Sequence, residues 1–375
     1  MSDGVFRCPT QIVQGRRFQE ALDSILSGRS WALMTSDGWM ERGISNKLRS
    51  QPDAVIADVK PNPKQSELAK FAMSIPNVDV IVSLGGGSVM DATKAALVVR
   101  GLGDRGMEIL NSHLREGALL PKEIQLPEFI AVPTTSGSGS EVTRWGTIWG
   151  DDGIKYSVND PRLYPTYAIL DPELTVSMSR EVTLFTALDA LSHAMESVWN
   201  RHHTPITDTL AEDVIKIVYG TLLSALENGQ DIESRILLQK AAVLAGLAIG
   251  VTQSALAHSI SYPFTSRCGV PHGLACSFTL AQVARYNLEE GSTRLIPIAN
   301  GLGCKLENIP ERIEEWFKTL GVGSSLSRYV DSSVVDQFGN HLITRSRAAN
   351  NIRRVDGLAA RQIAQDALDR ILNGN

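Results

Sequence analysis

One carboxylate and three histidines are the residues whose types and spacing predict metal chemistry. Asp189 and His193 lie four positions apart in the segment 186–196, and His258 and His272 follow later in the chain. In a helix, side chains four residues apart leave the same face, one turn apart. One oxygen and three nitrogens form a donor set that suits Fe²⁺ or Zn²⁺ better than Mg²⁺ or Ca²⁺, which prefer oxygen. These residues therefore make a candidate transition-metal site.

A simpler interpretation of the same residues stays open. A pair such as Asp189 and His193 also occurs as an ordinary pair on a helix surface, and His258 and His272 could be hydrogen-bonded core residues. Apolar neighbours of the first pair favour burial: Leu188, Ala190, Leu191, Ala194 and Met195. A buried carboxylate beside histidines needs a partner, and this favours the metal site.

Length and composition predict a soluble globular protein of two domains. The 375 residues are too many for one ordinary core, and the chain is 43% hydrophobic and 21% charged. A net charge of −5 without a dense Lys/Arg run predicts no nucleic-acid partner. No apolar leader and no uninterrupted apolar run of ~20 residues is present, so we expect no membrane partner. Four cysteines without a CxxC motif predict reduced thiols in the cytoplasm.

The first half of the chain alternates short β-branched runs with helical segments. Strands are predicted at 30–35, 54–59 and 79–84, with a helix at about 64–74 before the third strand. This alternation predicts a parallel sheet that is covered on both faces.

Two glycine- and hydroxyl-rich loops follow predicted strands. The loop 85–88 (Gly-Gly-Gly-Ser) leads into a helix at 89–99, and the loop 133–141 follows a strand at 129–132. Glycines let a backbone approach a phosphate, and the helix start offers free N–H groups. A tight turn and a flexible linker are the alternatives. Because ligands of open α/β sheets bind at the carboxyl ends of strands, the two loops together favour a dinucleotide.

Helical runs dominate the second half, for example 206–226, 233–249 and 310–320. We place the boundary after the last predicted strand and its exit, 168–174. The prediction is an α/β nucleotide-binding domain at 1–180 and an all-helical metal-binding and substrate domain at 181–375.

Several motifs in this order resemble the iron-containing (group III metal-dependent) alcohol dehydrogenases, which are related in fold to dehydroquinate synthase. The matching segments span nearly the whole chain: Gly85–Ser88 with Asp91 and Lys94, Pro133–Thr143, Asp171–Leu174, Asp189 with His193, and His258 with His272 and Gly273. The resemblance implies metal-dependent, NAD(P)-linked oxidation or reduction, with a homodimer as the expected assembly.

The resemblance also implies roles for individual residues. The metal ligands would be Asp189, His193, His258 and His272. The pyrophosphate would lie on Gly86, Gly87 and Ser88. The rest of the nucleotide site would be lined by Thr134, Thr135, Ser138 and Lys155, with Asn62 near the adenosine half.

The chain departs from the family pattern at two positions. NAD-using members usually have an aspartate where this chain has Ser36, with Asp37 following. A carboxylate there would repel a 2′-phosphate, so both NADPH and NADH are admissible. Many relatives have a histidine where this chain has Tyr262. Tyr262 could donate the proton to the alkoxide, or it could be a packing residue.

The segments 155–157, 196–200, 258–263 and 271–277 resemble one branch of the family, the phosphonoacetaldehyde reductases of phosphonate biosynthesis. Cations near the metal would bind the phosphonate. The candidates that flank the motifs are Arg144, Arg201, His202 and Arg267, each of which could instead be a solvated surface charge. We expect reduction of phosphonoacetaldehyde to 2-hydroxyethylphosphonate. A general alcohol or diol dehydrogenase, a dehydroquinate synthase-like lyase and an inactive nucleotide sensor are the alternatives.

Overall fold

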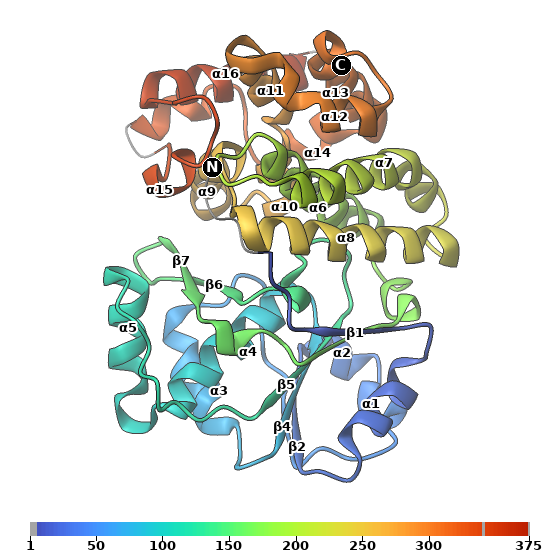
Figure 1. Cartoon of the computed structure of the whole chain (residues 1–375), viewed down its shortest axis with the longest axis vertical. Coiled ribbons are helices and arrows are strands. Elements are labelled where there is room, and N and C mark those ends of the chain that lie inside the picture. Colours follow the sequence, from blue (N-terminus) through green and yellow to red (C-terminus); the bar gives the residue numbers. More distant parts are fainter. Residues whose placement is uncertain (1–5, 340–341, 374–375) are drawn as a thin grey trace. The chain divides into compact units, whose positions relative to one another are not determined.

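The computed structural model describes residues 6–339 and 342–373, and the chain divides into two compact units (Figure 1). Cys8–Thr135 and Ser140–Thr175 form the first, which we call the α/β unit. Among the described residues, Ser136–Gly139 and those from Val176 onward, together with residues 6 and 7, form the second, the helical unit. The predicted fold class, an α/β unit followed by a helical unit, is confirmed. The predicted boundary at residue 180 stays a prediction.

A six-stranded parallel sheet forms the centre of the α/β unit, in the order β1-β8-β5-β4-β2-β3. Its strands are β1 (Gln11–Gln14), β2 (Trp31–Met34), β3 (Ala54–Ile56), β4 (Val80–Gly85), β5 (Glu128–Pro133) and β8 (Tyr167–Leu170). The chain passes from β3 back across β2 to reach β4, so the strand order reverses between β2 and β4. The loops that follow these strands leave the carboxyl edge of the sheet, where open α/β sheets bind ligands.

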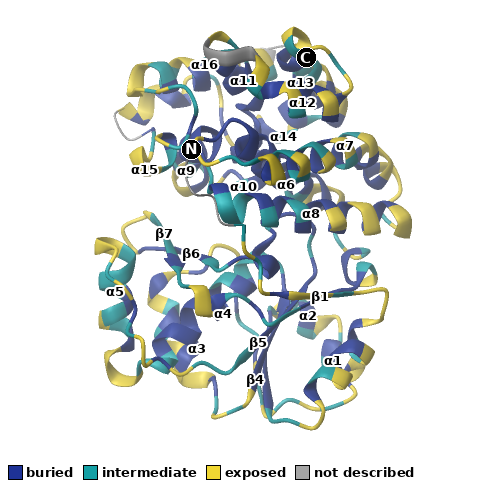
Figure 2. Ribbon diagram, viewed as in Figure 1, coloured by how far each residue is buried: buried dark blue, intermediate teal, exposed yellow. Residues whose placement is uncertain are grey.

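Both faces of this sheet are covered, which explains why its central strands are almost entirely apolar. Along β4, Ile81 packs in one hydrophobic cluster, while Val80 and Val82 pack in another. The helices on the Ile81 face are α3 (Leu68–Ser74), α4 (Gly87–Gly101) and α5 (Gly106–Glu116), with the antiparallel hairpin β6 (Trp145–Trp149) and β7 (Lys155–Asn159). The other face carries α1 (Phe18–Leu26) and α2 (Asp37–Glu41). Figure 2 shows the buried strands between helices whose outer sides are exposed.

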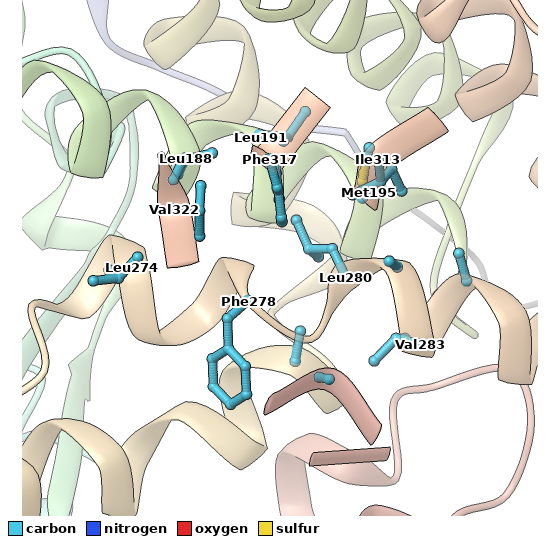
Figure 3. Packing of buried hydrophobic residues seen from close by; sticks show 14 of the residues in the cluster. Leu188, Leu191, Met195, Leu274, Phe278, Leu280, Val283, Ile313, Phe317 and Val322 are labelled. Carbon is cyan, nitrogen blue, oxygen red and sulfur yellow. The ribbon is translucent and has the colours of Figure 1, made fainter. Parts of the chain in front are cut away.

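The helical unit consists of helices and short 3₁₀ turns around one hydrophobic core. Its helices are α6 (Arg180–Val198), α7 (Pro205–Glu227), α8 (Ile232–Thr252), α9 (Leu256–Cys268), α10 (His272–Ser277), α11 (Leu280–Gly291), α12 (Ile296–Leu302), α13 (Ile309–Leu320), α14 (Val322–Leu326), α15 (Arg345–Ala348) and α16 (Gly357–Asn373). Figure 3 shows side chains of α6, α10, α11 and α13 in this core, among them Leu191, Leu274, Leu280 and Phe317.

Side-chain caps explain where the long helices begin. Ser179 accepts a hydrogen bond from the backbone N–H of Val182 at the start of α6, and Asp231 caps α8 in the same way. Helix α8 is also long and apolar enough to cross a membrane by length and composition, with a mean hydropathy of 1.5. However, 56% of that window is buried, and α8 packs against α6 and α7. We therefore interpret α8 as a core helix.

Gly273 allows α10 to lie directly against α6. A Cβ atom at this position would lie 1.8 Å from the carbonyl oxygen of Phe185 and 3.2 Å from the Cβ atom of Asp189. The first distance is far below any van der Waals contact, so only glycine permits this approach of the two backbones. Because Gly273 follows His272, the approach brings His272 next to the turn of α6 that carries Asp189.

We expect Gly273→Ala to separate α10 from α6. Overpacking of this tight contact should destabilise the protein by about 1–3 kcal/mol. Metal binding should weaken as well, because His272 would move away from Asp189. Gly220→Ala is the matched control, because Gly220 lies in the middle of α7 and its added Cβ would meet no heavy atom within 4 Å. That variant should be neutral or more stable by up to about 1 kcal/mol. Thermal unfolding and metal content of both variants test this; equal stability of the two would contradict the contact.

Candidate metal centre and nucleotide-binding loops

Three helices of the helical unit bring the four predicted ligands together. Asp189 and His193 leave one face of α6, His258 lies near the start of α9, and His272 is the first residue of α10. The Nε2 atoms of His193, His258 and His272 lie 3.7, 3.6 and 3.9 Å from Asp189 Oδ1. Ligand atoms of a tetrahedral ion with bonds of about 2.1 Å lie roughly 3.4 Å apart, so these spacings suit a small divalent cation.

Glu196 fixes the orientation of His258, and it was not predicted as a functional residue. Its fully buried carboxylate accepts hydrogen bonds from the backbone N–H groups of Ala255 and His258. It also lies 2.7 Å from His258 Nδ1. When Nδ1–H donates to Glu196, the lone pair of Nε2 faces Asp189. Metal-binding histidines generally have such a carboxylate partner on the other ring nitrogen.

The donor atoms fit a transition-metal ion in a further respect. His258 is 3% exposed, and its Nε2 atom finds no hydrogen-bond partner among the residues that the structure describes. A buried polar atom without a partner is costly, and a cation at this position would remove the cost. The rings of His193 and His258 are stacked, with centroids 4.9 Å apart, so both can present nitrogen to one point.

The charges of the metal centre stabilise one another. Burial raises the pKa of Asp189, but the imidazoles of His193, His258 and His272 outweigh it and lower that pKa well below its usual range. Burial opposes ionisation of Glu196 as well, and His258 outweighs it and lowers the pKa of that carboxyl. Both carboxylates are therefore ionised at neutral pH and available to hold a cation or its ligand.

Cys276 is a donor that the sequence interpretation left outside the ligand set. Its thiol, fully buried on α10, donates a hydrogen bond to Asp189 Oδ1 over 3.4 Å. Ligand atoms of Asp189, His258, His272 and Cys276 all lie within 4.8 Å of one another. Two sets of four donors, one with His193 and one with Cys276, thus share three members.

The predicted nucleotide loops meet at the carboxyl edge of the sheet in the α/β unit. Gly86 begins the turn into α4, and a Cβ atom there would lie 3.2 Å from Thr135 Oγ1. The backbone N–H of Asn62 donates to Ser88 Oγ over 3.2 Å. Gly87 is the first residue of α4, so the free N–H groups of that helix point into this loop cluster.

Three further predicted nucleotide residues have different surroundings. Thr134 is 3% exposed; its Oγ1 accepts a hydrogen bond from Trp39 Nε1, so it also holds α2 against the sheet. Ser36 precedes α2 as its N-cap residue and is half-buried. Lys155 starts β7, with its Nζ atom 6.0 Å from the centre of the Trp149 ring.

The second loop was predicted as a single nucleotide-binding stretch, but its middle belongs to the helical unit. Ser138 lies in this part, Ser136–Gly139. A Cβ atom on Gly137 would lie 2.6 Å from the Thr186 carbonyl oxygen, and one on Gly139 would lie 2.3 Å from Gly246 Cα. The glycines of this loop therefore permit close packing against α6 and α8. Neither the nucleotide-binding interpretation nor the flexible-linker alternative predicted this packing.

A buried ion network holds the end of this loop. The Lys94 ammonium group on α4 donates to the carbonyl oxygens of Ser140, Thr143 and Trp145 over 2.7–2.9 Å. Ser140 Oγ in turn donates to Asp91. Burial lowers the pKa of Lys94 to about 8. Burial also raises the pKa of the neighbouring Glu141 to about 7.

The four predicted substrate cations differ in their surroundings. Arg144 is half-buried, stacks over Trp145 and has a buried Nε without a hydrogen-bond partner in the described part of the chain. Arg201 and His202 are exposed after the end of α6, and Arg201 Nε donates to the Asn351 carbonyl. Arg267 is exposed, roughly two and a half turns beyond His258 on α9, which places it on the opposite face.

Tyr262, the predicted proton donor, lies one helical turn beyond His258. The two residues are four positions apart in α9, so both side chains leave the same face, and Tyr262 is half-buried. Its catalytic role stays a prediction, as do the roles of the other site residues.

Comparison with known families identifies the class of protein. The model of the iron-containing alcohol dehydrogenases matches residues 9–172, and the model of the C-terminal part of the Fe-containing alcohol dehydrogenase family matches residues 183–367. The chain therefore belongs to the iron-containing alcohol dehydrogenase family. The enzyme class expected from the sequence, a nicotinamide-dependent, iron-type alcohol dehydrogenase, is confirmed.

Individual relatives resemble the chain over most of its length. A phosphonoacetaldehyde reductase of Streptomyces viridochromogenes is 29% identical, over 88% of this chain and 84% of that protein. A 1-propanol dehydrogenase of Salmonella typhimurium is 32% identical, over 75% of this chain and 73% of that protein. The crystal structure of sulfoacetaldehyde reductase from Bifidobacterium kashiwanohense in complex with NAD⁺ is similar with a TM-score of 0.88 and 27% identity, over 97% of this chain and 98% of that one.

Glu196→Gln should weaken metal binding through the orientation of His258. The amide keeps one acceptor but loses the charge and one of the oxygens that hold Ala255 and His258, so the metal affinity should fall by about 10–100-fold. Competition with a chelator for Zn²⁺ measures this. Glu181→Gln on the same helix is the control, because Glu181 is half-exposed and pairs with Arg328 away from the histidines. Unchanged affinity in the Glu196 variant would refute the orienting role.

Glu141→Gln should change how stability depends on pH. The pKa of Glu141 is raised from 4.5 to about 7, so the folded protein retains a proton that the unfolded chain has lost between these values. Its contribution to stability is therefore fully present below pH 4.5 and is lost as the pH rises through 7, by about 3 kcal/mol at most. The variant should gain thermal stability over the wild type between pH 5 and pH 7.5. Glu116→Gln, at an exposed site on α5, should not; identical pH profiles for all three proteins would contradict this.

Proposed function

We propose that this enzyme reduces a two-carbon aldehyde with an anionic head group to its primary alcohol. Phosphonoacetaldehyde, reduced to 2-hydroxyethylphosphonate, is the proposed substrate. The ring of three histidine nitrogens around Asp189 Oδ1 is the observation that carries the reaction class. The choice of substrate is supported by the relative named phosphonoacetaldehyde reductase and by the solved sulfoacetaldehyde reductase, both of which are named for two-carbon aldehydes with an acidic group.

In this proposal the side chains have separate tasks. When bound, the divalent cation supplies Lewis-acid polarisation of the carbonyl oxygen, and the reduced nicotinamide supplies the hydride. Asp189 and the histidine Nε2 atoms hold the cation, with Fe²⁺ and Zn²⁺ both suited to them. Glu196 keeps the proton of His258 on Nδ1, away from the reacting oxygen. Tyr262 donates its hydroxyl proton to the product oxygen, directly or through water.

Among the four candidate cations, we propose that Arg144 binds the anionic head group. Its buried Nε without a described partner supports this choice, since a phosphonate or sulfonate oxygen would supply the missing acceptor. Arg201 already donates to Asn351, and His202 and Arg267 are exposed, which makes them weaker candidates.

Sulfoacetaldehyde is the second candidate substrate. The similarity in fold to the solved sulfoacetaldehyde reductase, with a TM-score of 0.88, favours it. The two substrates differ in charge, because a sulfonate carries one negative charge and a fully ionised phosphonate carries two. A general alcohol dehydrogenase, as suggested by the relative named for 1-propanol, is the third.

Either NADH or NADPH is admissible, because Ser36 stands where a carboxylate would exclude the 2′-phosphate. A homodimer and a cytoplasmic location complete the proposal; four free cysteines support the latter.

The proposed substrate is tested by the oxidation of NADH and of NADPH by anaerobically purified, metal-loaded enzyme. Phosphonoacetaldehyde, sulfoacetaldehyde, propanal and glycolaldehyde are compared. The kcat/KM for phosphonoacetaldehyde should exceed that for propanal by at least about 100-fold, because a charged pocket discriminates strongly against an uncharged substrate.

The Arg144→Met variant extends this test. It should lose most of that preference and keep its activity with propanal, whereas Arg267→Met should behave like the wild type. Equal rates with all four aldehydes would refute the anionic substrate and leave the general dehydrogenase. No oxidation with any aldehyde would favour the lyase.

A further inference from the structure

The chain makes a sharp turn between α8 and α9, just before the helix that carries His258. Only the residues 253–255 separate Thr252, the last residue of α8, from Leu256, the first residue of α9. At the start of this turn Gln253 has φ 60° and ψ 167°, a conformation that almost only glycine adopts. A residue with a side chain is strained there, and such strain persists only where the surroundings fix it.

Several other helices of the chain end without this strain. Helices α5, α9, α12 and α13 are each followed by a glycine with positive φ, namely Gly117, Gly269, Gly303 and Gly321. Glycine would also adopt the conformation of Gln253 without strain, because it has no Cβ atom. A glutamine at this turn therefore indicates that its side chain has a use that offsets the strain.

Hydrogen bonds from distant parts of the helical unit fix the turn. Arg347 Nη1, on α15, donates to the side-chain Oε1 of Gln253 over 2.6 Å. Asn200 Nδ2, fully buried beyond the end of α6, donates to the backbone carbonyl oxygen of Gln253 over 2.9 Å. Asn350 Nδ2 donates to the carbonyl oxygen of the next residue, Ser254, over 2.8 Å. Both the side chain and the backbone of the turn are thus held.

The turn determines where α9 begins relative to Glu196. Two residues after Gln253, the backbone N–H of Ala255 donates to one oxygen of the Glu196 carboxylate, and that of His258 donates to the other. The same carboxylate lies 2.7 Å from His258 Nδ1. Since φ and ψ are the only soft torsions of the backbone, a change at Gln253 would rotate the start of α9. It would displace the His258 ring from Glu196 and from Asp189.

We propose that Gln253 is a positioning residue of the metal centre, which acts through His258 and is not itself a ligand. Its strained backbone, fixed by Arg347 and Asn200, holds the start of α9 so that Nε2 of this histidine faces the cation. The inference rests on the metal site of the proposed function. It predicts that glycine, which adopts this conformation unaided, supports metal binding at position 253 and that alanine does not.

The variants Gln253→Ala and Gln253→Gly test the inference, because they differ by one Cβ atom and both lose the hydrogen bond from Arg347. Alanine keeps the Cβ atom that makes this conformation costly, so the turn should relax. Its Zn²⁺ affinity, measured by competition with a chelator, should fall by about 10-fold. Glycine needs no hydrogen bond to adopt the conformation, so its affinity should stay within about 3-fold of the wild type. Thermal unfolding of the metal-free proteins reports their stability separately.

A second set of variants leaves the side chain of Gln253 in place at first. Arg347→Met removes the hydrogen bond to Gln253 and should also weaken Zn²⁺ binding by about 10-fold. Adding Gln253→Gly to this variant should restore the affinity. Arg345→Met is the matched control, because Arg345 is exposed on the same helix, α15, and it should bind Zn²⁺ like the wild type. This set decides the question if the alanine variant does not fold.

The outcomes separate this inference from the proposed function. Equal Zn²⁺ affinities of Gln253→Ala and Gln253→Gly would overturn the positioning role, since a side chain that only packs would be missed equally in both. An Arg347→Met variant that glycine does not restore would overturn it too. In both cases a wild type that binds Zn²⁺ leaves the metal site standing. A wild type that takes up no Zn²⁺ would overturn both the positioning role and the metal site.

Discussion

The metal centre depends on the contact between the backbones of α10 and α6 at Gly273. Nothing larger than a hydrogen atom fits between its Cα and the Phe185 carbonyl, so the two helices cannot approach in this way with another residue there. That single approach places one donor pair of α10 opposite one donor pair of α6. The surrounding core, with Leu188 of α6 and Leu274 of α10 in Figure 3, then holds the helices in this position.

Buried charge is the second constraint, and it follows from the first. The helix contact places Asp189 and Glu196 in a dry interior, where an ionised carboxylate is costly unless it is paired. Glu196 is paired with His258 and two backbone N–H groups. Asp189 faces imidazole nitrogens and a thiol, which are themselves metal donors. A cation among these donors would add to the stabilisation that the histidines give to the two carboxylates.

The α/β unit uses a buried cation of its own for a different purpose. Lys94 donates to the carbonyl oxygens of Ser140, Thr143 and Trp145, and it fixes the backbone after the second nucleotide loop. A lysine can bind several carbonyl oxygens at once because its ammonium group has three protons. Both nucleotide loops are therefore attached to α4: the loop at Gly86 leads into the helix, and the end of the loop that starts at Thr134 is bonded to Lys94. The free N–H groups of the same helix are expected to bind the phosphates.

The sequence by itself determined the features that arise from local periodicity. Four-residue spacing placed Asp189 and His193 on one helix face, and strand, glycine turn and helix in succession predicted the parallel sheet and the loop at Gly86. The edge strand β1 and the hairpin β6–β7 were not predicted; β1 is a short edge strand with mostly exposed side chains, so it has little hydrophobic signal.

Only the tertiary structure decided the contacts between residues far apart in the chain. Glu196 bonds to His258 across 62 positions, and Cys276 bonds to Asp189 across 87. The middle of the second glycine loop packs on α6 and α8, and Arg267 falls on the far side of α9 from His258. The period of a helix or strand determines only which face of its own element a side chain leaves. Which elements meet, and which donors then share one point, depends on the packing of backbones such as those of α6 and α10 at Gly273.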